Sequence, residues 1–226
     1  AVLAAWPSFF TFILALVVIA GRQLALAILQ HEASHRTLFE TTWLNTHLAN
    51  WLCARPVWQD VTKYRPYHLS HHVKAGTDDD PDVTLHKNYP VARASLARKF
   101  LRDITGLTGL NTVYGLILMD AEVIKWTLAN DIVRLPGNGR KLHHYLAAMV
   151  RNMAPMLIAN GALFSILALS GHAWLYAVWA LAFVTPLPLF IRIRSIAEHG
   201  AMERVPDVLR NTRTTRAGLL ARMTVA

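Results

Sequence analysis

Charged residues are scarce in this chain, and two long stretches have none. Asp, Glu, Lys and Arg make up 16% of the 226 residues, against about 25% in a typical soluble domain. The first charged residue is Arg22, and 40 consecutive residues between Arg151 and Arg192 carry no charge. These absences argue against an ordinary soluble enzyme, a coiled coil and a disordered chain.

Cysteine is nearly absent as well. The single Cys53 excludes an internal disulfide framework and a zinc site built from several cysteines. Histidine is abundant by contrast, with 11 residues. Any metal site in this chain is therefore expected to rest on imidazole ligands, which suit Fe, Zn, Cu and Ni.

The uncharged stretches predict an all-α, integral membrane helical bundle. A spanning helix needs about 20 apolar residues, so we place spans at about residues 9–29, 147–169 and 173–192. Ser8 is a candidate N-cap for the first span, and residues 1–5 are interpreted as the end of an earlier helix. A cleavable signal peptide fits poorly, because no basic segment precedes the apolar stretch.

The distribution of Lys and Arg predicts the orientation in the membrane. Residues 31–144 contain 14 of them, residues 192–226 contain 7, and the loop 170–172 contains none. The positive-inside rule then makes 31–144 and 193–226 cytoplasmic, as a helical cap below the bundle. The net charge of +9 is explained by topology, so no nucleic-acid partner is expected.

Within this cytoplasmic part, we expect amphipathic helices at the membrane surface. Residues 42–58 and 97–129 both mix apolar side chains at helical spacing with polar or basic ones. Residues 77–82 (TDDDPD) predict a turn or loop.

Three histidine motifs carry the predicted chemistry. The first is HEASH at 31–35, whose two histidines are four residues apart and share a helix face. The second is HLSHH at 68–72, and the third is a single histidine just after the last span. The predicted topology brings all three to one side of the membrane. The expected metal ligands are His31, His35, His68, His71, His72 and His199.

The remaining histidines lack partners at ligand spacing or lie elsewhere in the predicted topology, and we do not expect them to bind metal. They are His47, His86, His143, His144 and His172.

Several polar residues near the motifs have two interpretations. Asp80 and Asp82 either accept hydrogen bonds from histidine ring N–H groups or form a solvated acidic turn. Arg36, Tyr64 and Arg65 either meet a substrate head group or pair with lipid phosphates.

The motifs resemble those of the membrane fatty acid desaturase family. The resemblance rests on HEASH at 31–35, YRPYHLSHH at 64–72, the Asp80-Pro81-Asp82 sequence and AEHG at 197–200. It implies a site of two iron ions ligated mainly by the six histidines. It further implies an acyl-lipid or fatty acyl substrate, O₂, and two electrons from a ferredoxin- or cytochrome-type donor with its reductase. Ser195 replaces an Asn that some relatives use near the iron, so that role is not transferred.

The resemblance also sets an expectation about completeness. The family has a further H-x-x-H-H motif, and no histidine follows His199 here. We therefore expect residues 1–226 to be a single membrane domain truncated at both ends, which alone holds two irons poorly and is inactive. The expected location is the bacterial cytoplasmic membrane, with the histidine motifs on the cytoplasmic side.

Other functions remain open from the sequence. The same superfamily includes hydroxylases and alkane or carotenoid oxygenases. HEASH also matches the H-E-x-x-H motif of zinc proteases, with Glu32 as general base. A membrane metal transporter is a third alternative, although the uncharged 40-residue stretch offers few mid-membrane polar groups.

Overall fold

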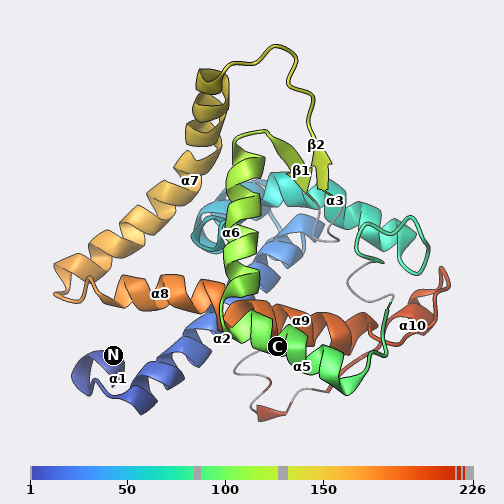
Figure 1. Ribbon diagram of the computed structural model, residues 1–226, viewed down its shortest axis with the longest axis horizontal. Helices are drawn as coiled ribbons and strands as arrows, with labels where there is room; N and C mark the ends of the chain where they lie inside the picture. The colour runs from blue at the N-terminus through green and yellow to red at the C-terminus, as the bar shows by residue number, and fades with distance from the viewer. Residues whose placement is uncertain (1, 84–87, 127–131, 217, 220, 222–226) are drawn as a thin grey trace.

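The computed structural model describes residues 2–83, 88–126, 132–216, 218–219 and 221, and most of their regular structure is helical (Figure 1). The α-helices are α1 (Val2–Ala5), α2 (Phe9–His35), α3 (Val61–Lys74), α5 (Arg93–Ile104), α6 (Leu107–Asp120), α7 (Leu142–Leu169), α8 (Leu175–Val184), α9 (Pro186–His199) and α10 (Val208–Asn211). Shorter elements are the π-helical turns η1 (Leu44–Leu48) and η2 (Asn50–Ala54), the 3₁₀ turn η3 (Arg55–Val57), and strands β1 (Ile124–Trp126) and β2 (Ile132–Arg134).

Three helical segments among the described residues are long and apolar enough to cross a membrane. They are Phe9–His35, Leu142–Leu169 and Leu175–His199, with mean hydropathies of 2.4, 1.6 and 1.6. The third consists of α8 and α9 in succession. The predicted all-α membrane bundle is confirmed, and its helices run past the predicted spans at 9–29, 147–169 and 173–192.

The first spanning helix begins where the sequence predicts. The Ser8 hydroxyl accepts a hydrogen bond from the Thr11 backbone N–H at 3.2 Å, and the Thr11 hydroxyl accepts one from the Ser8 N–H at 2.9 Å. This reciprocal cap satisfies N–H groups that have no partner within the helix. At the other end Arg36 adopts a left-handed conformation (φ 64°) and stops α2 directly after His35.

The helices of the bundle pack through small residues. Ala20 and Leu24 of α2 lie against Ala182, Leu187 and Phe190 of α8 and α9, and Figure 1 shows α2 passing across the junction of these two helices. Small side chains let membrane helices approach closely, which strengthens van der Waals packing.

Other apolar side chains of the spanning helices face outward. Ile158 is 61% exposed and Leu169 is 89% exposed. Exposed apolar surface of this kind is suited to contact with lipid.

Residues 42–58 are helical as predicted, but with π and 3₁₀ turns in place of a regular α-helix. Ala49 and Ala54 are buried against Ala33 at the end of α2, while Trp43 and Trp51 are exposed. The Asn50 side chain accepts a hydrogen bond from the Val61 N–H at 3.0 Å. This packing and this tertiary bond hold the segment against α2 and α3.

The prediction of helix throughout 97–129 is wrong in part. Gly106, with φ 87°, separates α5 from α6, and α6 ends at Asp120. Ile124–Trp126 then pairs as an antiparallel strand with Ile132–Arg134. A left-handed glycine interrupts a helix, and β-branched residues favour strand pairing over helix. Residues 127–129 of the predicted helix lie outside the described residues.

A buried ion pair joins α5 to α9. The Asp103 side chain is fully buried and receives two hydrogen bonds from the Arg192 guanidinium, at 2.5 and 2.9 Å. The Thr108 hydroxyl donates a third at 2.6 Å. These bonds attach the cap helix α5 to the last spanning segment.

We predict that Asp103→Ala lowers the free energy of unfolding by about 3 kcal/mol or more, because it leaves the Arg192 charge without its partner in a largely buried position. Thermal unfolding in detergent measures the effect. Asp78→Ala is the control, because Asp78 is 89% exposed in its pair with Arg204; it should change stability by less than about 0.5 kcal/mol. Equal losses in the two variants would contradict the role given to Asp103.

Candidate metal centre

The first two histidine motifs occupy the last turn of α2 and the second half of α3. Asp60 begins α3 by accepting hydrogen bonds from the backbone N–H groups of Thr62 and Lys63, at 2.7 and 3.1 Å. Its other oxygen accepts from Arg55 at 2.5 Å. Burial alone would raise the pKa of Asp60, but these hydrogen bonds and the Arg55 charge lower it overall. The charged cap therefore fixes where the second motif begins.

Arg65 holds the two motifs together. Its guanidinium donates to the carbonyl oxygens of Ser34 at 2.9 Å and Ala33 at 3.2 Å, both in the last turn of α2. Carbonyl groups at a helix C-terminus lack partners within the helix and carry partial negative charge. Arg65 thus contacts protein backbone, where the sequence suggested a head group or a lipid phosphate.

Four histidines converge in the space between these helices. Ring nitrogens of His31, His35, His68 and His72 all lie within 4.8 Å of one another. His68 Nε2 is 2.8 Å from His35 Nε2 and 3.0 Å from His72 Nε2. Two ligands about 2.1 Å from one ion are at most roughly 4.2 Å apart. The donor set and its spacing therefore fit a metal such as iron with small side-chain adjustments.

The environment keeps His68 neutral. Burial, together with the charges that His31 and His72 carry when protonated, lowers the pKa of His68 to about 3. The Tyr64 hydroxyl lies 3.1 Å from His68 Nδ1, four residues earlier on the same face of α3. Burial raises the pKa of Tyr64, so the phenol stays protonated. Its oxygen can accept from Nδ1–H, which leaves Nε2 free to bind metal.

Asp80 orients the next histidine of the second motif. His71 Nδ1 is 2.7 Å from Asp80 Oδ1, and both side chains are buried. Burial alone would lower the pKa of His71, but the bond to Asp80 and the charges of Asp82 and Asp80 raise it overall. With Nδ1 bonded to a carboxylate, Nε2 is the nitrogen available to a metal. Asp80 is thus a buried hydrogen-bond acceptor, although Asp78 and Asp79 of the same turn are exposed.

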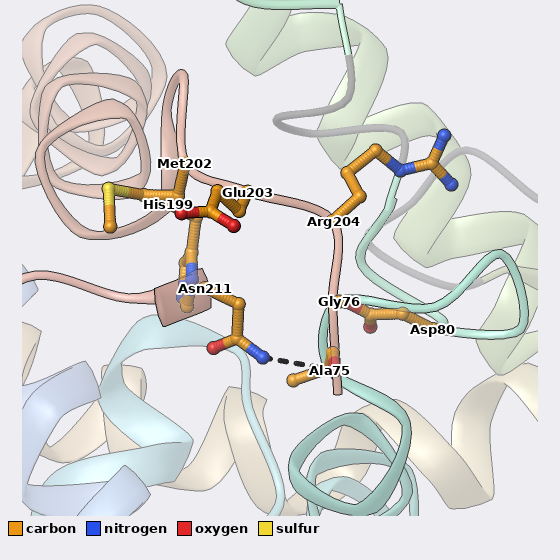
Figure 2. Close-up of a pocket in the computed structure, with 8 residues that line it drawn as sticks. All are labelled: Ala75, Gly76, Asp80, His199, Met202, Glu203, Arg204 and Asn211. Atoms are coloured by element: carbon orange, nitrogen blue, oxygen red, sulfur yellow. Dashed lines mark hydrogen bonds between the residues drawn. The ribbon is translucent and has the colours of Figure 1, made fainter. Parts of the chain in front are cut away.

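The sixth predicted ligand lies beside His71. The rings of His71 and His199 are 5.5 Å apart and nearly perpendicular, although His199 is not one of the four clustered histidines. Figure 2 shows a small pocket next to His199, with the Asn211 amide donating to the Ala75 carbonyl at 3.1 Å. The pocket has a volume of about 10 Å³, enough for roughly one water.

A larger cavity opens onto the histidines. It has a volume of about 700 Å³, which is in the usual range for a small-molecule site. The lining combines apolar side chains of α2 and α9 with charged and polar groups. Its lining includes Leu24, Ala27, Ile28, Ile191, His31, His68, His71, His72, His199, Arg194 and Glu198.

The remaining described histidines are outside this centre. His47 contacts Trp43 at 5.0 Å between ring centroids, and His143 and His144 contact each other at the start of α7. His172 bonds to the Ser170 carbonyl in the loop before α8. His86 lies outside the described residues.

Sequence reasoning missed two contributors. The first is the contact of Tyr64 with His68, which the spacing of four residues along a helix could have predicted. The second is Gln30, a buried residue of the cavity wall, which no feature of the sequence identifies.

The fold and this geometry define an integral membrane protein with a histidine-rich candidate metal centre at the end of a spanning helix. The family model for fatty acid desaturases matches residues 4–224, so the chain belongs to the fatty acid desaturase family. This is a family of oxidoreductases of the desaturase and hydroxylase type. No curated protein sequence and no solved structure matched the chain.

We predict that Asp80→Ala weakens metal binding by about 10- to 100-fold, because it frees the ring of His71 to rotate or change tautomer. Titration of the metal-free protein with ferrous iron measures the affinity. Asp79→Ala, an exposed neighbour in the same turn, should bind as the wild type does. Unchanged affinity in the Asp80 variant would contradict the orienting role.

We also predict that the metal-free protein loses stability as the pH falls below about 6.5. Between this value and the folded pKa of about 3, His68 takes up a proton in the unfolded chain but not in the folded one. Thermal unfolding at pH 7 and pH 5, after chelation, should show a smaller loss for His68→Gln than for the wild type. His172→Gln is the control and should retain the wild-type slope.

Proposed function

We propose that this protein is a membrane-bound, iron-dependent desaturase that introduces a double bond into a fatty acyl chain. The proposed iron ligands are His31, His35, His68, His71, His72 and His199. The observation that carries the proposal is that ring nitrogens of four histidines lie within 4.8 Å of one another, and that three of these histidines, His31, His68 and His72, line a large, partly apolar cavity. Membership of the desaturase family supports it.

The chemistry of the substrate calls for a redox metal. The C–H bonds of a methylene do not respond to side-chain acids or bases, so a cofactor has to supply the difficult step. When bound, iron supplies oxidation by O₂, with two electrons from a ferredoxin- or cytochrome-type donor. The protein supplies neutral imidazoles: the lowered pKa values of His68 and His72 keep their lone pairs available at physiological pH.

Access from the membrane is supported by the cavity lining. Leu24, Ala27 and Ile28 belong to a spanning helix, and Ile191 faces them from α9. These side chains suit the methylene chain of an acyl substrate, and their exclusion of water protects the site from side reactions. Arg194, Glu198 and other polar groups of the lining suit a head group or solvent.

We place the centre on the cytoplasmic side of a bacterial membrane. The Lys and Arg residues, concentrated in 31–144 and 192–226, support this orientation. It makes the histidines accessible to a soluble electron donor and its reductase.

A zinc protease is not favoured. The Glu32 carboxylate, which would act as general base, bonds to His31 Nδ1 and to the Thr37 hydroxyl, each at 3.0 Å. Four clustered histidines also leave no open position on a tetrahedral zinc, which a catalytic site requires.

The test is expression of the full-length protein in a host of defined lipid composition, followed by fatty-acid profiling. We expect new double bonds, and their loss on His68→Ala or His71→Ala because each removes a ring from the metal centre. His172→Ala should retain the product. New hydroxyl groups would assign the protein to the hydroxylases of the family, and unchanged acyl chains would refute the proposal.

A further inference from the structure

Gln30 is a buried polar residue in the wall of the large cavity. It lies in α2 directly before His31 and is only 2% exposed. Its amide nitrogen Nε2 is buried and has no hydrogen-bond partner among the residues that the structure describes. Buried donors are almost always paired, and an unpaired one costs free energy. A donor left unpaired beside a cavity therefore points to a partner that binds there.

Gln23, in the same helix, is a buried glutamine whose amide nitrogen has a partner within the protein. It is seven residues earlier and fully buried, and it donates from Nε2 to the Trp179 carbonyl of α8 at 2.9 Å. Its Oε1 accepts no hydrogen bond from the described residues, so the two glutamines differ in their donor groups. Unlike Gln30, it is not part of the cavity lining. The two residues lie on one face of α2, so their difference comes from what surrounds them.

Gln30 lies next to the histidine cluster in the cavity wall. Gln30 and His31 are consecutive, so they lie about 1.5 Å apart along the helix axis and about 100° apart around it, and both line the cavity. Leu24, six residues earlier, lies about 9 Å away along the axis. A chain whose apolar tail lies along Leu24 and Ile28 would thus present its nearer end to Gln30 and the histidines together.

We propose that Gln30 determines substrate specificity by donating a hydrogen bond from its amide to a neutral oxygen of the substrate, a carbonyl or a hydroxyl. This bond sets which carbon of the chain faces the histidine cluster, close to the oxygen-bearing carbon. The inference rests on the proposed function, since it names the substrate class of the same site. It adds that the preferred chain is oxygenated near the carbon that reacts.

An uncharged oxygen fits this donor better than a carboxylate does. A buried carboxylate needs a cationic partner. The cavity lining has two arginines: the Arg194 guanidinium is already paired with Glu198 at 2.8 Å, and Arg213 donates to the Gly200 carbonyl. The amide of Gln30 is neutral, and so is the acceptor we assign to it.

A binding experiment tests the inference without turnover. Methyl palmitate, hexadecanol and hexadecane are compared as ligands of the purified full-length protein by thermal shift. We expect the wild type to bind the ester, the alcohol or both about threefold to tenfold more tightly than hexadecane, as one neutral hydrogen bond allows. Gln30→Leu should lose this preference and bind all three alike, whereas Gln30→Asn, which keeps the amide, should retain part of it.

Stability separates this role from a structural one. Gln30→Leu removes an unpaired donor, so without ligand it should unfold at or above the wild-type temperature. Gln23→Leu is the matched control: it should unfold at a lower temperature because the bond to Trp179 is lost, yet keep the ligand preference. No preference in the wild type, or equal loss of preference in both Leu variants, would overturn the inference.

Product analysis provides the second readout. In the lipid-defined host, Gln30→Leu should spread the new double bond over several positions, while Gln23→Leu should keep the wild-type position. An unchanged position in an active Gln30→Leu enzyme would overturn the inference and leave the proposed function standing. A wild type without product would refute the function, while the binding comparison would still decide the role of Gln30.

Discussion

The contact between Arg65 and the C-terminus of α2 is the interaction on which the centre depends. It joins two helices that are separate in sequence and places their histidine motifs face to face. The Ser34 carbonyl lies in the last turn of α2, where the helix itself supplies no donor, while the Ala33 carbonyl also accepts from the Arg36 backbone N–H at 3.1 Å. The Arg65 guanidinium thus donates to carbonyl groups within the first motif and fixes the position of the second motif, because Arg65 lies three residues before His68 in α3.

The same geometry controls protonation. Ring nitrogens of four histidines lie within 4.8 Å of one another, and burial disfavours the charged forms of His68 and His72. His68, at the middle of the group, has its pKa lowered to about 3. His71, which faces Asp80 and Asp82, has its pKa raised instead. The lowered pKa values of His68 and His72 favour the neutral rings that metal ligation requires. His71 is oriented by its carboxylate partner, and a metal there has to displace its second proton.

Local patterns predicted much of this correctly. The uncharged stretches predicted the spanning helices, Ser8 predicted the start of α2, and the spacing of His31 and His35 predicted a shared helix face. Errors arose where the outcome depended on distant partners. Residues 97–129 were predicted as helix, yet Gly106 interrupts it and Ile124–Trp126 finds a strand partner at Ile132–Arg134. Arg65 was assigned to head groups or lipid phosphates, because nothing in its local sequence reveals the carbonyl groups it meets.

The sequence by itself determined that the protein is an α-helical membrane protein and which histidines are available as ligands. Both follow from hydropathy and from spacing along a helix, which are local properties. Only the tertiary structure decided that His31, His35, His68 and His72 form one group while His71 pairs with Asp80 beside His199. It also decided that the amide nitrogen of Gln23 donates to Trp179, while that of Gln30 has no partner among the described residues. These distinctions depend on which helices pack together. Two glutamines of one helix have different hydrogen-bond partners because packing places different neighbours beside them.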